Sequence, residues 1–195
     1  MMIRVLALDI DGVLNSERFL HARGCTTSEL GTKYRQSHPL RMIDPVAVQR
    51  LNRVLAATGA VCVLSSAWRI IHELDAVQGY LEHHGFIGKL IDRTPGYGDL
   101  LERQAIERDG QRIVPGYCRG VEIQAWLDEP AVWTGTGFID GGPLSPPRRN
   151  LIKRFAIVDD SDNMGHLKPY LVRTTWQEGL QDEHVGLLIK MLGGG

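Results

Sequence analysis

The strongest constraint on the fold lies near the start of the chain, where the apolar run Val5-Leu6-Ala7-Leu8 passes directly into Asp9-Ile10-Asp11-Gly12. An unbroken apolar run of this length is typical of a strand buried on both faces of a parallel sheet. Such sheets bind ligands outside the carboxyl ends of their strands, which is where Asp9 and Asp11 would emerge. Side chains two apart on a strand point to the same side, so both carboxylates can face one pocket if the chain turns at Gly12.

Two carboxylates held this close together need a proton or a cation between them. Mg²⁺ suits such a site because it prefers oxygen ligands, keeps several of its waters and can hold a phosphate group at the same time. The opening segment therefore predicts a magnesium site and phosphoryl chemistry.

Two further apolar strands are expected to end in polar side chains. Residues 60–64 form a short apolar run that leads into Ser65-Ser66-Ala67-Trp68-Arg69, and the apolar run 155–158 leads into Asp159-Asp160. Between the first two strands, Asp44 and Pro45 are typical of a helix start, and Gly59 is typical of its end.

A second helix is expected over 70–84, with Gly85 as its stop signal. Alternating strands and helices predict an α/β fold with a parallel sheet and right-handed crossovers. Three strand ends would then deliver polar groups to one edge of that sheet, and the length of the chain favours a single domain over residues 1–195.

Two segments fit no regular element in the sequence pattern. Residues 16–43 are basic and aromatic, and they predict either a small flap over the pocket or a surface loop. Residues 132–149 contain Gly-rich turns between aromatic residues and predict a hairpin-like insertion.

The composition, the cysteines and the net charge bear on the location and the partners of the protein. The chain is 43% apolar and has no run long enough for a membrane span, and its start leads into a strand rather than a signal peptide. Cys25, Cys62 and Cys118 are odd in number and form no Cys-x-x-Cys pair, which argues against disulfides and zinc and favours a cytoplasmic location. The net charge of −1 gives no overall bias toward nucleic acids or membranes.

In order and context, these strand ends resemble the motifs of the haloacid dehalogenase (HAD) superfamily. Asp9-Ile10-Asp11-Gly12 matches its first motif, Ser65 its second and Asp159-Asp160 its fourth. Arg119 resembles the third-motif cation because it opens an amphipathic helix whose apolar side carries Ile123, Trp126 and Leu127. Competing candidates for that cation lie downstream: Arg148, Arg149, Lys153 and Arg154.

A narrower resemblance is to the phosphatase-like domain of Swiss Army Knife RNA repair proteins, and more distantly to the phosphatase half of polynucleotide kinase-phosphatases. It implies a Rossmann-like HAD fold with only a small cap insertion. It also implies a phosphorylated substrate, either a small molecule or a nucleic-acid end, with no role for a membrane.

The resemblance further implies a role for each matched residue. Asp9 would be the nucleophile and Asp11 the general acid and then base, while Ser65 would bind a phosphate oxygen and Arg119 would neutralise transition-state charge. Mg²⁺ would be held by Asp9, the backbone carbonyl of Asp11 and an acid of the fourth motif, Asp160 or its neighbour Asp159. Further substrate contacts are expected from Ser66, Arg69 and Gly12, although Arg69 could equally be an ordinary residue at a helix start.

The implied function is a Mg²⁺-dependent phosphatase that hydrolyses a phosphomonoester through an aspartyl-phosphate, with nucleic-acid or nucleotide phosphate ends among the candidate substrates. Asp11 favours this reaction over carbon–halogen cleavage, since the dehalogenase branch lacks that second acid. A phosphotransferase or mutase of the same fold, and a non-catalytic phosphate-binding module, stay open as alternatives.

Overall fold

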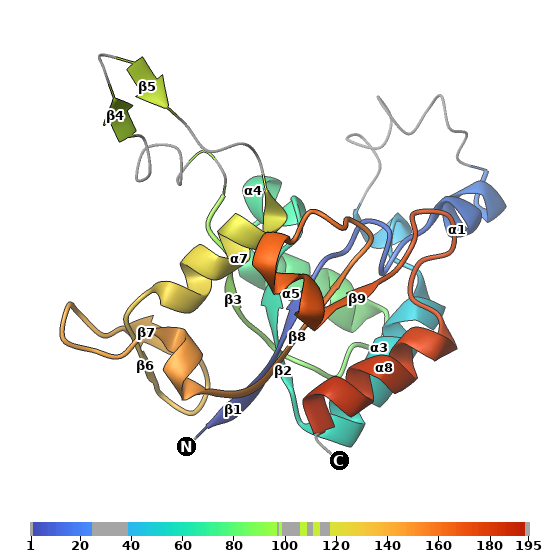
Figure 1. The fold of residues 1–195 in the computed structure, drawn as a ribbon. Coiled ribbons are helices and arrows are strands. Elements are labelled where there is room, and N and C mark those ends of the chain that lie inside the picture. The colour runs from blue at the N-terminus through green and yellow to red at the C-terminus, as the bar shows by residue number, and fades with distance from the viewer. Residues whose placement is uncertain are drawn as a thin grey trace.

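The centre of the protein is a five-stranded sheet with strand order β3-β2-β1-β8-β9, in which all neighbouring strands are parallel (Figure 1). The computed structural model describes residues 2–24, 39–96, 98, 106–108, 111–113 and 118–193. The sheet strands are β1 (Ile3–Leu8), β2 (Val61–Leu64), β3 (Leu90–Arg93), β8 (Ile152–Asp159) and β9 (Leu171–Arg173). This arrangement confirms the predicted α/β fold with a parallel sheet flanked by helices.

Helices cover both faces of the sheet, as the continuous apolar runs require. Leu6 and Leu8 of β1 belong to a core cluster shared with α3 (Pro45–Thr58), α5 (Leu74–His83) and α8 (Asp182–Gly193). Val5 and Ala7 face the other way and pack with α7 (Arg119–Asp128) and the 3₁₀ helix η3 (Gly165–Tyr170). Alternate residues of one strand thus supply two cores.

The first long helix begins and ends where its capping residues predict. The Asp44 side chain accepts a hydrogen bond of 2.8 Å from the backbone N–H of Val46, and Pro45 occupies the first turn of α3. Gly59 closes the helix with a φ of +63°, a conformation that suits glycine because it carries no Cβ.

The helix expected over 70–84 is wrong as a single element, because the chain forms two helices, α4 (Trp68–Ile71) and α5. His72 and Glu73 are extended between them, with φ/ψ of −131°/143° and −68°/150°. Ile70 and Ile71 are largely exposed, so they do not continue the buried apolar stripe that Val77 and Leu81 form on α5. α4 reaches the core through Trp68, and α5 reaches it through Val77 and Leu81 after the extended residues His72 and Glu73.

The segment 16–43 is more regular than its pattern suggested. It contains α1 (Glu17–Ala22), which is capped by the Ser16 hydroxyl, and the 3₁₀ helix η1 (Pro39–Arg41). Ser16 and Leu20 are buried, so this part of the segment belongs to the body of the protein. Residues 25–38 lie outside the described residues, and the flap stays a prediction.

A hairpin lies in and just before the segment 132–149. β6 (Ala131–Trp133) pairs antiparallel with β7 (Phe138–Asp140), and the 3₁₀ helix η2 (Arg148–Leu151) follows. The Phe138 ring packs edge-on against both Trp126 of α7 and Trp133 of β6. A second hairpin, β4 (Ile106–Arg108) with β5 (Gln111–Ile113), was not predicted. Within the described residues, no helix is long and apolar enough to cross a membrane.

Candidate active site

The register of the sheet brings three polar strand ends to one edge. Leu8 pairs with Leu64 of β2 on one side and with Val158 of β8 on the other. Backbone hydrogen bonds continue past these pairs, from Ser65 N to Leu8 O at 2.8 Å and from Asp9 N to Val158 O at 3.1 Å. Asp9, Ser65 and Asp159 are therefore neighbours, as the strand-end pattern predicted.

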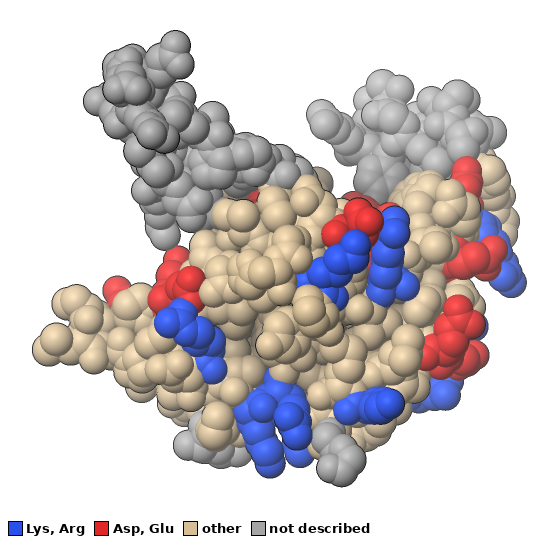
Figure 2. Space-filling view, in the orientation of Figure 1, with Lys and Arg blue, Asp and Glu red and all other residues tan. Residues whose placement is uncertain are grey.

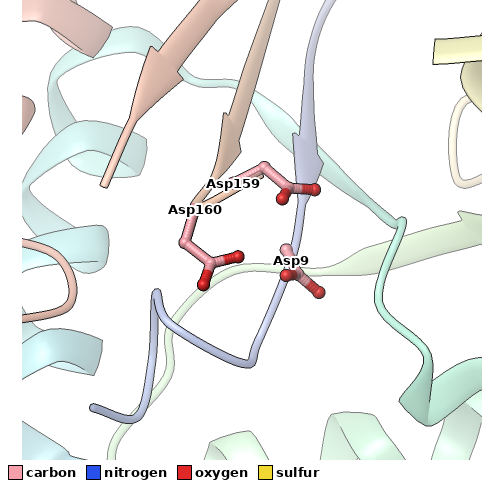
Figure 3. A group of neighbouring side chains, drawn as sticks. All are labelled: Asp9, Asp159 and Asp160. Carbon is pink, nitrogen blue, oxygen red and sulfur yellow. The ribbon is translucent and has the colours of Figure 1, made fainter. Parts of the chain in front are cut away.

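Three carboxylates gather at this edge (Figure 3). Asp9 follows β1, while Asp159 and Asp160 lie at the end of β8, and one oxygen of each lies within 4.8 Å of the others. Asp9 and Asp159 are almost fully buried, and Oδ1 of Asp9 has no hydrogen-bond partner among the described residues. Buried anions at this spacing require a cation or protons, and an all-oxygen donor set fits a hard divalent ion.

Asp11 is held beside this cluster by two N–H donors. Its Oδ1 accepts hydrogen bonds from Asn15 Nδ2 at 2.8 Å and from the indole Nε1 of Trp68 at 3.1 Å. Asn15 in turn accepts from the backbone N–H of Gly12 at 2.9 Å. Ile10, between the two acids, is fully buried in the core. Trp68 is buried, and its indole N–H orients Asp11.

Two serines at the end of β2 face the same cluster. The hydroxyl oxygen of Ser65 is buried and lacks a hydrogen-bond partner among the described residues. The Ser66 hydroxyl accepts from the Trp68 backbone N–H at 3.4 Å. It also forms a hydrogen bond with Asp9, which offsets a small part of the rise that burial causes in the pKa of that carboxyl. Ser66 thus contributes both to the start of α4 and to the site.

Among the candidate third-motif cations, Arg119 is the one placed at the cluster. Its Nε lies 3.4 Å from Asp159 Oδ2, and its Nη1 donates to the backbone carbonyl of Ser65. The downstream candidates lie elsewhere. Arg148 pairs with Asp92 and Glu129, Arg149 pairs with Asp128, and Lys153 and Arg154 lie at the opposite end of β8.

The contacts of Arg69 do not support its predicted role as a substrate ligand. Its side chain is buried and makes a 2.8 Å salt bridge to Glu122, while its other donors bond backbone carbonyls, including those of Ser65 and Thr94. Glu122 also lies 3.5 Å from Arg119. Arg69 and Glu122 thus join the end of β2 to α7, and sequence reasoning had given Glu122 no role.

Glycines allow the loop after β8 to approach the site closely. Gly12 has a φ of +73°, and a Cβ there would lie 2.4 Å from Asp160 Oδ2. Gly120 at the start of α7 abuts the same loop, since a Cβ there would lie 2.1 Å from the backbone carbonyl oxygen of Met164. Gly12 therefore acts by making room for an acid of the cluster.

A family model for the HAD domain in Swiss Army Knife RNA repair proteins matches residues 5–185. The chain belongs to this family. The match includes every strand end described above, and membership in the HAD family points to a phosphatase or a related hydrolase. No curated protein and no solved structure matches the chain significantly.

The acids of this HAD domain bind protons more tightly than free carboxyls do. Burial, followed by the charge of Asp159, raises the pKa of Asp9 well above its ordinary value. Burial raises the pKa of Asp159 to about 6, although Arg119 opposes the shift. The pKa values of Asp11 and Asp160 are also raised, chiefly by burial.

These shifts predict how pH and Mg²⁺ act on stability. A carboxyl with a raised pKa in the folded state binds more protons folded than unfolded, so metal-free stability should fall as pH rises from about 4 through 6 and above. Mg²⁺ should raise the melting temperature, and should do so more at pH 7.5 than at pH 5 because protons compete with it. Calorimetry at pH 5 and pH 7.5, in Ca²⁺-free buffers that contain either Mg²⁺ or EDTA, measures the two melting temperatures. An equal rise in melting temperature with Mg²⁺ at both pH values would contradict the prediction.

Gly12→Ala should weaken Mg²⁺ binding and activity together, because the added methyl displaces the Asp160 carboxylate. The control is Gly59→Ala, where φ is also positive but nothing lies within 4 Å of the new Cβ. Both variants should lose about 1 to 2 kcal/mol of stability from backbone strain. If Mg²⁺ affinity falls equally in both, the approach of Gly12 to Asp160 is not what matters.

Arg119→Ala should lower kcat by about 10²-fold or more, because it removes fixed positive charge beside the acids. Arg119→Lys should recover part of the rate, since it keeps the charge but loses the fork geometry. The control is Arg53→Ala, which removes an arginine that pairs with Asp182 on the surface. Turnover measured on the folded fraction checks this. Retained turnover in Arg119→Ala with a loss in Arg148→Ala would move the third motif downstream.

Proposed function

We propose that this HAD domain is a Mg²⁺-dependent phosphatase that hydrolyses a phosphomonoester through an aspartyl-phosphate on Asp9. The observation that carries the proposal is the buried Oδ1 of Asp9, which lies in a cluster of acids and has no hydrogen-bond partner in the described part of the chain. A carboxylate in this position can attack phosphorus once the phosphate oxygens are neutralised. The fixed carboxyl of Asp11 beside it supplies the proton transfers that the reaction needs.

The reaction runs in two half-reactions. In the first, a carboxylate oxygen of Asp9 bonds to phosphorus, the bond from phosphorus to the leaving oxygen breaks, and Asp11 donates a proton to that oxygen. In the second, Asp11 takes a proton from water as the water oxygen attacks phosphorus. The aspartyl–phosphorus bond breaks, inorganic phosphate leaves, and both acids return to their starting states.

The metal site is assigned to Asp9, Asp160 and the backbone carbonyl of Asp11, with Asp159 beside them. Asp159 Oδ1 accepts from the Ser161 backbone N–H at 2.9 Å, and its Oδ2 lies 3.4 Å from Arg119 Nε in an ion pair that is not a hydrogen bond. Asp160 is the half-buried member of the cluster and is the better direct ligand. When bound, Mg²⁺ would neutralise phosphate oxygens during the transfer. Ser65 and Ser66 would donate hydrogen bonds to the same phosphate.

The substrate class we propose is a phosphorylated nucleic-acid or nucleotide end. Support comes from the family description, which refers to HAD domains of RNA repair proteins. A cavity of about 650 Å³ also touches the site at Arg119, although the acids of the cluster do not line it. Its wall carries both signs of charge, with Arg93 and Arg119 beside Glu73, Asp92, Glu122 and Glu129. Its size suits a sugar or base beyond the reacting phosphate. We also propose that the protein is cytoplasmic and that residues 1–195 form a single domain.

A substrate screen tests this function. The purified protein with Mg²⁺ would be offered 3′- and 5′-phosphorylated oligonucleotides, nucleotides and sugar phosphates, and inorganic phosphate would be measured. We expect release from at least one phosphorylated end, dependent on Mg²⁺ and absent in Asp9→Asn. Phosphate transferred to an added alcohol in place of water would indicate a phosphotransferase, and binding without turnover would indicate a phosphate-binding module.

A further inference from the structure

A second groove lies at the opposite end of β8 from the acids. It has a volume of about 610 Å³ and is bordered by the start of β8, by α7 and η3, and by the end of α8. β9 pairs only with Ile157–Asp159, so the first half of β8 has no described strand beside it on that edge. The groove lies where this edge is uncovered, and every residue that lines it belongs to the described part of the chain.

The groove is cationic. Arg149, Lys153, Arg154 and His166 line it, and its lining includes no Asp or Glu. Lys153 and Arg154 are exposed and form no ion pair with any described residue. Arg149 pairs with Asp128 but leaves about half of its side chain, 53%, exposed to solvent. Figure 2 shows Lys and Arg side chains gathered along the lower part of this face, below α7 and η3.

Aromatic rings accompany these charges. Phe155 and Tyr170 both line the groove, and their rings meet edge to face with centroids 5.9 Å apart. Tyr170 is 45% exposed, so solvent and ligands can reach part of its side chain. Proteins that bind single-stranded nucleic acids combine unpaired cations with an exposed aromatic ring. The cations bind the phosphates, and a base stacks on the ring.

We propose that this groove binds single-stranded nucleic acid, with the backbone on Lys153 and Arg154 and a base stacked on Tyr170. The proposal goes beyond the phosphatase function and does not require catalysis. A lipid surface fits less well, because the site is concave and Tyr170 is the one groove residue among the exposed large hydrophobics of the described chain. An alternative is that Lys153 and Arg154 only prevent the uncovered edge of β8 from pairing with another chain. That alternative does not explain the exposed aromatic ring beside them.

Fluorescence anisotropy with a labelled 12-nucleotide single strand, as RNA and as DNA, tests the proposal. The probe carries hydroxyl groups at both ends and is no substrate for a phosphomonoesterase, so a failure here is distinct from a failure of the proposed function. The test variant is Lys153→Gln with Arg154→Gln. The control is Lys89→Glu, which changes net charge by the same amount at the exposed start of β3, on the other edge of the sheet.

We expect the double variant to bind both probes about tenfold more weakly, with the slope of log K against log salt smaller in magnitude by about 1.4. Tyr170→Ala should weaken binding by about fivefold or more without changing that slope. Lys89→Glu should bind as the wild type does, and thermal unfolding should show that all variants are folded.

Equal weakening by the double variant and by Lys89→Glu would overturn the proposal, since only net charge would then matter. An unchanged salt slope in the double variant would overturn it as well. A third arm uses vesicles containing phosphatidylserine. If the wild type binds these and the double variant does not, while both bind the oligonucleotides alike, the groove serves a membrane surface and the proposal is wrong.

Discussion

Asp9→Asn is expected to lower Mg²⁺-dependent phosphate release by about 10⁴-fold or more, because an amide cannot serve as the nucleophile. The substitution keeps nearly the same shape in a position that is 3% exposed. It also removes a buried negative charge that lies beside Asp159 and Asp160. In the absence of metal the variant should therefore melt at a higher temperature than the wild type at pH 7.5.

Two measurements check this result. Steady-state release of phosphate gives the loss of turnover, and rapid quenching with a ³²P-labelled substrate shows whether the labelled aspartyl enzyme disappears. Asp44→Asn is the matched control, because Asn caps helices as well as Asp does and Asp44 lies outside the site. Near-normal turnover by Asp9→Asn would rule out nucleophilic catalysis by this residue.

Asp11→Asn is expected to reduce turnover by about 10² to 10⁴-fold, with the larger loss on substrates whose leaving oxygen is strongly basic. The amide oxygen can still accept from Asn15 and Trp68, so the side chain should keep its position. What the variant lacks is the proton for the leaving group. An alkyl or ribosyl phosphate should therefore suffer much more than nitrophenyl phosphate, whose leaving group needs little protonation.

The second half-reaction gives an independent readout for the same variant. Asp11 also accepts the proton from the attacking water, so Asp11→Asn should accumulate the phosphorylated enzyme when nitrophenyl phosphate is the substrate. A burst of nitrophenol equal to the enzyme concentration, followed by slow release, is the expected trace. An equal rate loss on both substrates without a burst would make Asp11 a structural residue only.

The parts of the fold that could be predicted depend on local signals. The apolar runs predicted the core strands, and the polar residues that end them met at one edge because neighbouring parallel strands end together. The limits of α3 followed from Asp44, Pro45 and Gly59, whose capping needs no information beyond a few residues. The acids at 9, 11, 159 and 160 were identified in the same way.

The parts that were missed depend on contacts between distant segments. No Pro or Gly marks the break at His72, which is caused by where α5 packs. Trp68 gave an apolar signal, yet its N–H reaches across to Asp11 from another strand end. Glu122 was given no role, whereas the fold buries it next to Arg69 and Arg119. Contacts of this kind between distant residues produce no periodic pattern in the sequence.

The loop that follows β8 is confined between two positions that have no side chain. Gly12 abuts Asp160 on one side of it and Gly120 abuts the Met164 carbonyl on the other. The length of this loop is therefore restricted. An inserted residue would force the Asp160 side chain closer to Gly12 or the Met164 carbonyl closer to Gly120. The β6–β7 insertion is under no such restriction, and Leu144 in the turn after it is fully exposed. Natural changes in length should accumulate in that insertion and be rare between Asp160 and Met164.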